Sequence, residues 1–173
     1  MNMKMYGLPA ASLLLASALG ASLAAADTAP SAAQSMSSMR FLLGTWTCSV
    51  KAVDGSNPQV TTVSTMSADG TKMLNRTVSG GDGTGQMWLD PNKRQWIQTA
   101  DSTKGTSSQM SSGWTGHTIV WTGTLSANGM PTMGYRTTVV KVNDAKTTQI
   151  DELGNPSGGT WITADSAVCA KGR

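Results

Sequence analysis

The stretch Gly44-Thr45-Trp46-Thr47-Cys48 contains the first of the two cysteines in this chain, and the second, Cys169, lies close to the C-terminus. Trp46, Cys48 and Val50 alternate with polar residues, and this period of two predicts a half-buried β-strand. A disulfide between the two cysteines would join the first strand of the domain to the last. We therefore expect a closed antiparallel barrel, the architecture that brings those two strands together.

Residues 1–26 have the pattern of a cleaved secretion signal peptide. Lys4 supplies a positive charge, Leu13–Leu23 an apolar stretch, and Ala24-Ala25-Ala26 a small-residue cleavage site. The apolar stretch is shorter than the roughly 20 residues that span a bilayer, so we expect no membrane span. The sequence thus predicts a periplasmic or secreted protein that begins near Asp27. In such a compartment a pair of cysteines is usually oxidised.

The composition favours strands and excludes one class of partner. Thr and Ser are abundant, whereas the chain contains a single Phe and a single Glu, a residue that favours surface helices. The formal net charge is only +3, and no basic run is longer than Lys93-Arg94. A nucleic-acid-binding protein would carry a larger basic patch, so we expect no nucleic-acid partner.

Turn residues divide most of the chain into short, regular segments. Residues 27–38 form a predicted leader, Met36–Leu43 a short helical turn, and residues 39–173 a single β-barrel domain. Strands are expected at residues 45–51, 59–67, 72–79, 84–89, 94–101, 106–112, 117–126, 132–142, 146–153 and 160–169. This spacing predicts an all-β fold, a closed antiparallel up-and-down barrel of 8–10 strands, because an open meander would leave edges exposed.

The cysteine pair also predicts a strand register. If Cys48 faces Cys169 in antiparallel strands, Lys171 lies opposite Trp46 on the same face of the sheet. A lysine amine over an indole would form a cation–π pair. The alternative is a frayed C-terminal tail.

Several short motifs resemble those of a known protein family. A helical turn followed by Gly44-Thr45-Trp46 resembles the opening of lipocalin-like barrels. The middle of the chain adds Gly83–Asp90, Lys93 with Trp96, and Asp101-Ser102. Together they resemble the pattern of exported bacterial lipocalin-like (calycin-type) barrels of unknown function, akin to nitrobindins and fatty-acid-binding barrels. The resemblance spans roughly residues 38–170 and implies a fold rather than a particular activity.

The sequence departs from this family pattern at two places. Leu89 stands where an aromatic residue usually precedes the turn aspartate. The stretch Ala167–Ala170 contains no histidine, whereas nitrobindins carry their haem ligand late in the barrel. We therefore expect no haem and no other cofactor.

The aromatic residues are the main candidates for contact with a ligand. Trp46, Trp96 and Trp121 alternate in step with apolar neighbours and are predicted to face inward. They would either line a cavity or simply fill the core. Three further residues in predicted strands complete the set of candidate ligand-binding residues: Tyr135, Arg76 and Arg136. An arginine inside the barrel could pair with an acidic head group, although an outward orientation is the default.

The residues that carry catalysis or bind metals in other proteins are sparse here. His117 is the only histidine, and we interpret it as a solvated turn residue rather than a base. No metal-ligand spacing occurs, so we expect no metal site. Asp151-Glu152 is the only adjacent acidic pair, and strand neighbours point to opposite faces, so we interpret it as a solvated strand end. No catalytic residues are predicted, and we expect no enzyme.

Two functional hypotheses follow. The first is an exported, non-enzymatic binding protein that holds a small apolar or amphipathic ligand inside the barrel. The second is a protein-interaction module with a filled barrel, such as an inhibitor or an envelope factor. The two differ in whether a cavity exists and in whether the partner is a small hydrophobic ligand or another protein.

Overall fold

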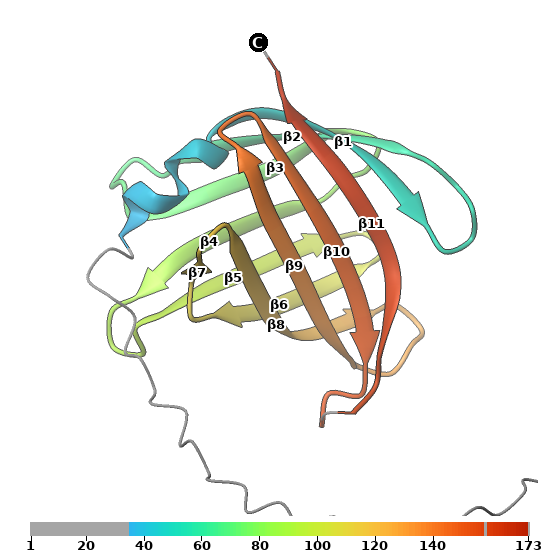
Figure 1. The fold of residues 1–173 in the computed structure, drawn as a ribbon. Coiled ribbons are helices and arrows are strands. Elements are labelled where there is room, and N and C mark those ends of the chain that lie inside the picture. Colours follow the sequence, from blue (N-terminus) through green and yellow to red (C-terminus); the bar gives the residue numbers. More distant parts are fainter. Residues whose placement is uncertain (1–34, 158, 173) are drawn as a thin grey trace, which may run out of the picture.

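The computed structural model describes residues 35–157 and 159–172, which form a closed antiparallel β-barrel (Figure 1). The predicted signal peptide and residues 27–34 of the predicted leader lie outside the described residues. Ten long strands make the barrel: β1 (Gly44–Ala52), β2 (Gln59–Met66), β3 (Lys72–Ser79), β4 (Thr84–Asp90), β5 (Gln95–Ser102), β6 (Gly105–Ser111), β8 (Thr118–Ala127), β9 (Met133–Asn143), β10 (Lys146–Gly154) and β11 (Trp161–Lys171). The predicted fold class is confirmed.

The strands run up and down in chain order. Each long strand pairs with the next, β6 pairs directly with β8, and β1 pairs with β11 to close the sheet. A two-residue strand, β7 (Trp114–Thr115), was not predicted; it pairs with the start of β8 through a tight turn at Gly116 and His117. Gly116 has a φ of 59°, which suits a glycine in a turn of this kind. His117 is exposed in that turn, so β8 begins one residue later than predicted.

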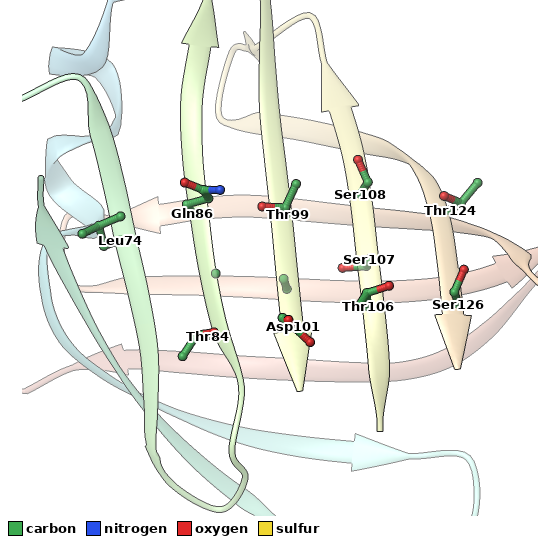
Figure 2. A pocket seen from close by; sticks show the side chains of 12 residues that line it. Leu74, Thr84, Gln86, Thr99, Asp101, Thr106, Ser107, Ser108, Thr124 and Ser126 are labelled. Atoms are coloured by element: carbon green, nitrogen blue, oxygen red, sulfur yellow. The ribbon is translucent and has the colours of Figure 1, made fainter. Parts of the chain in front are cut away.

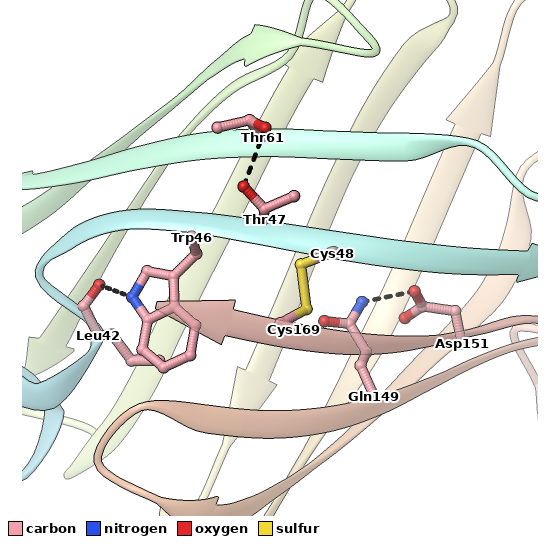
Figure 3. The surroundings of a disulfide bond; sticks show 8 residues. All are labelled: Leu42, Trp46, Thr47, Cys48, Thr61, Gln149, Asp151 and Cys169. Carbon is pink, nitrogen blue, oxygen red and sulfur yellow. Dashed lines mark hydrogen bonds between the residues drawn. A yellow bond between two sulfur atoms is a disulfide. The ribbon is translucent and has the colours of Figure 1, made fainter. Parts of the chain in front are cut away.

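The predicted disulfide joins the first and last strands. Cys48 of β1 lies directly opposite Cys169 of β11 and is bonded to it, with 121 residues of separation along the chain (Figure 3). Both side chains lie on the inner face, because burial alternates along β1 with Trp46 and along β11 with Ala167. The bond therefore fastens the barrel at its closing seam. Such a bond is typical of proteins in oxidising compartments outside the cytoplasm.

One end of the barrel is covered by a short 3-10 helix, η1 (Met36–Leu42). Two strand residues hold its last carbonyl groups: the indole Nε1 of Trp46 donates to the Leu42 oxygen at 2.8 Å, and Nζ of Lys171 donates to the Phe41 oxygen at 2.9 Å. These bonds satisfy carbonyls that a helix end leaves without partners. Lys171 also faces Trp46, with Nζ 5.8 Å from the ring centroid, so the predicted cation–π pair is confirmed.

The disulfide should contribute strongly to stability. Replacing both Cys48 and Cys169 by Ala should lower the free energy of unfolding by about 3–5 kcal/mol, because a long loop in the unfolded chain is no longer closed. Urea unfolding of the oxidised protein and of the double variant measures the difference. An unchanged midpoint would show that the seam is held by strand pairing alone.

The Lys171 contacts should contribute to stability independently of the disulfide. Lys171→Met keeps the aliphatic stem over Trp46 but removes the ammonium group, and we expect a loss of about 1–2 kcal/mol. Lys146→Met is the matched control, since Lys146 is exposed on the neighbouring strand β10. Thermal unfolding of the two variants should separate them; equal melting temperatures would contradict the assignment.

Candidate ligand-binding site inside the barrel

An apolar cavity of about 200 Å³ lies inside the barrel beneath η1. Every second residue of each strand faces inward, and these residues form the walls of the cavity. Aromatic and sulfur-containing side chains dominate the lining: Trp46, Trp114, Trp121, Met39, Met73 and Met87. Trp114 Nε1 points at Met39, with 3.2 Å between the nitrogen and Sδ, which ties the helix to β7. The lining is adaptable, since methionine side chains adjust to irregular shapes.

A second cavity of about 230 Å³ lies toward the opposite end of the barrel and has a different chemistry. Its lining combines Tyr135, Asp151 and Asp165 with small hydroxyl and apolar side chains. A third hollow of about 140 Å³ lies between the two. It shares Thr62 and Asn75 with the apolar cavity and shares Gly83 and Ala100 with the acidic one. The three spaces therefore adjoin one another along the wall formed by β2 to β5.

A hydrogen-bonded chain of polar side chains crosses the interior. Gln98 Nε2 lies 3.4 Å from Gln109 Oε1, and Gln109 Nε2 donates to Thr137 Oγ1 at 3.1 Å. Thr137 donates in turn to one oxygen of Asp151, and Gln149 Nε2 donates to the other at 2.6 Å. Gln109 is only 1% exposed, so its hydrogen bonds to other side chains take the place of hydrogen bonds to water. This series of hydrogen bonds fixes the Asp151 carboxylate in place.

Asp151 faces a second carboxyl group inside the barrel. Asp165 on β11 lies directly opposite Asp151 on β10, next to a β-bulge that shifts the register of this strand pair. Burial, together with the charge of Asp151, raises the pKa of Asp165 from 3.8 to about 7. Burial and the same carboxylate also raise the pKa of the Tyr135 phenol above its usual value. The interpretation of Asp151 as a solvated strand end is wrong, because it is 5% exposed.

The predicted aromatic residues face the interior. Trp46 and Trp121 line the apolar cavity, and Tyr135 lines the acidic one. Trp96 is fully buried in the apolar core, and its Nε1 has no hydrogen-bond partner. The acidic residue Asp165 was not predicted.

The two predicted arginines lie on the outside. Arg76 is exposed on β3. Arg136 pairs with Glu152, with 2.6 Å between Nε and Oε2, and its guanidinium lies 4.7 Å from the centroid of the Trp161 ring. Glu152 and Asp151 thus point to opposite faces of β10, as alternation predicts. Neither arginine lines any of the three internal hollows.

One wall of the internal space carries an unpaired acceptor. The carboxamide oxygen of Asn75 is buried and accepts no hydrogen bond, although it lies where the apolar cavity meets the middle hollow. A buried polar atom without a partner costs about 1–3 kcal/mol, so such atoms are rare in folded proteins. A ligand with a suitably placed donor would satisfy it.

A larger hollow of about 560 Å³ lies on the outer face of the barrel (Figure 2). Strand register sets its side chains in two rows across β4, β5, β6 and β8, namely Gln86, Thr99, Ser108 and Thr124 in one and Thr84, Asp101, Thr106 and Ser126 in the other. These side chains are short and hydrophilic. The outer hollow therefore presents hydroxyl, carboxyl and amide groups, whereas the cavity beneath η1 is lined mainly by aromatic and sulfur-containing side chains.

Comparison with known proteins assigns this chain to no family. No protein-family model matches the sequence, and no curated protein matches it significantly. Within residues 35–157 and 159–172, no three His, Cys, Asp or Glu side chains gather closely enough to hold a metal ion. In that same part of the chain, no helix has the length and apolar character needed to cross a membrane.

The Asp165 carboxyl should make stability depend on pH. Because its pKa in the folded protein is about 7 against an ordinary value of 3.8, the folded state binds this proton more tightly than the unfolded state. The free energy of unfolding should therefore fall as the pH rises from about 4 to about 7 and then level off.

Asp165→Asn should remove much of this fall and make the protein about 1 kcal/mol more stable at about pH 8, a modest gain because the group is only half-buried. Urea unfolding at several pH values measures both effects. A profile unchanged by the substitution would show that the two carboxyl groups do not interact in the folded protein.

Proposed function

We propose that this chain is an exported, non-enzymatic binding protein that holds a small amphipathic molecule inside its barrel. The observation that carries the proposal is the apolar cavity beneath η1, which is lined by three tryptophans and adjoins a polar space. Ligand sites are typically concave and mostly apolar, with a few polar groups that fix orientation. The apolar part of the ligand would contact Trp46 and Trp121, and its polar part would extend toward Tyr135.

The size of the apolar cavity supports this proposal over a filled barrel. Protein interiors are packed almost as densely as organic crystals, and empty spaces much larger than a water molecule are few. A space of about 200 Å³ with a largely apolar lining is therefore better explained by a molecule that occupies it than by a filled barrel.

The disulfide supports the exported location in this proposal. Together with the N-terminal pattern of residues 1–26, it favours the periplasm or the extracellular space. The closed barrel also agrees with the proposed relationship to the exported lipocalin-like proteins.

One observation favours the alternative of a protein-interaction module. Apolar side chains are exposed on the outer face of the sheet: Val120 on β8, and Ile150 and Val168 on the adjacent strands β10 and β11, each more than 40% exposed. Exposed apolar side chains that gather on one face are typical of protein-binding surfaces. A pull-down from the envelope fraction tests it, and loss of the captured partner with Val168→Lys but not with Lys51→Ala would support it.

Filling the apolar cavity should abolish ligand binding. Ser64 of β2 is buried and lines the cavity, so Ser64→Leu places extra carbon atoms where the ligand would lie. The control is Thr65→Leu, because Thr65 is the next residue and is exposed on the other face. Titration with fatty acids, alkyl alcohols, alkylamines and isoprenoids, followed by tryptophan emission, should give saturable changes for the wild type and the control.

For Ser64→Leu we expect binding to be at least about tenfold weaker, the loss expected when apolar contacts worth about 1.4 kcal/mol are removed. If no compound in the panel binds the wild-type protein, the proposed function is wrong. If the two variants bind equally well, the ligand lies outside this cavity.

A further inference from the structure

The acidic cavity indicates what kind of polar group the ligand carries, and this inference rests on the proposed function. The interior presents hydrogen-bond acceptors where a ligand would lie. Asp151 and Asp165 line the acidic cavity, and the unpaired Asn75 oxygen lines the middle hollow that adjoins it. Of these acceptors, the Asn75 oxygen has no partner, and an N–H or O–H donor would satisfy it. A ligand that supplies donors therefore suits this lining.

The described residues place no positive charge beside these carboxylates. No lysine, arginine or histidine lines the three internal hollows in the described part of the chain. The two inward-facing lysines at the η1 end are already engaged. Lys171 donates to the Phe41 carbonyl, and Lys141 pairs with Asp144, with 2.7 Å between Nζ and Oδ1. A carboxylate inside a protein without a cationic partner is costly, so where both carboxyl groups are ionised a cation from outside would be favoured.

The placement of the two carboxyl groups suits a compact cation. Side chains directly opposite each other in an antiparallel pair have Cβ atoms about 4.5–5.5 Å apart, and like charges at such positions repel. Thr137 and Gln149 hold Asp151 rigidly, so the repulsion cannot be relieved by its rotation. An ammonium group has three donors and could reach both carboxylates.

We propose that the ligand carries a protonated amine that binds against Asp151 and Asp165, while its apolar part extends past Asn75 into the cavity lined by Trp46 and Trp121. The acceptors, the lack of a cation in the lining and the residues that the middle hollow shares with each of the other two all support this orientation. The negative charge of the two carboxylates excludes an acidic head group from this position. An arginine facing inward would instead have favoured an acidic head group.

The proposal predicts how binding depends on pH. The titratable groups that face Asp165 are Asp151 on β10 and Tyr135 on β9. On β1, the residue opposite Asp165 is Ala52, which does not titrate, and Asp101 of β5 also lines the cavity. Burial raises the pKa of Asp165 to about 7, so this carboxyl ionises as the pH passes neutrality. Amine affinity should therefore rise between about pH 6 and about pH 8, while a primary alkylamine stays protonated.

Three matched probes test the proposal: octylamine, octan-1-ol and octanoate, titrated into the oxidised protein by calorimetry. At about pH 8 we expect octylamine to bind about tenfold more tightly than octan-1-ol, as expected for hydrogen bonds to a charged group, and octanoate to bind most weakly. Asp165→Asn should reduce the advantage of octylamine several-fold and leave octan-1-ol unchanged. Asp54→Asn, in an exposed turn, controls for the change in net charge.

The outcomes separate the two proposals. Octanol or octanoate binding as tightly as octylamine would overturn the amine proposal and leave the binding function intact. An octylamine affinity of the wild-type protein that does not rise with pH would overturn it too, without reliance on any variant. Failure of all three probes to bind would contradict the binding function itself.

Discussion

The pairing of β1 with β11 is the constraint on which the rest of the structure depends. Without it, ten strands would form an open sheet with two unpaired edges, and the inner face would have no enclosed volume. Its register sets both ends of the interior. At one end it places Lys171 against Trp46 beneath η1, and at the other it aligns Ala52 with Asp165, while the disulfide holds the seam between them.

The closed interior has an apolar part and a polar part, which differ in their side chains and are not separated by backbone. Methionine and tryptophan side chains pack beneath η1, whereas glutamine, threonine and aspartate form a hydrogen-bonded layer farther along the barrel. Buried polar groups are tolerated when they are paired, and most of this layer is. The Asn75 oxygen has no hydrogen-bond partner, and the carboxyl groups of Asp151 and Asp165 face each other without a cation between them; all three residues line the internal hollows. A barrel evolved only for stability would have little reason to retain them.

Much of the fold could be predicted from sequence, but much of the site could not. Period-two patterns and turn residues are local, so all ten long strands and the Cys48–Cys169 register were predictable. The acidic pair depends on a non-local register. A simple hairpin with a loop at residues 154–159 would place Ile162 opposite Asp151. The observed pairing of Gly154 with Trp161 would by itself place Ala164 there, and the bulge near Ala164 then brings Asp165 opposite Asp151. Arg76 and Arg136 lie on the outside because they occupy the outward-facing positions of their strands. The sequence around each arginine does not reveal this, since apolar residues occur on both faces of the strand.

The most direct measurement is a native mass spectrum of the protein purified from its own host. We expect excess mass that disappears on denaturation, of a size that fits an apolar cavity of about 200 Å³ and the hollows that adjoin it. The mass of the released compound would identify its chemical class. A spectrum showing only the disulfide-bonded chain, under conditions that retain noncovalent ligands, would contradict the claim that the barrel holds a bound molecule.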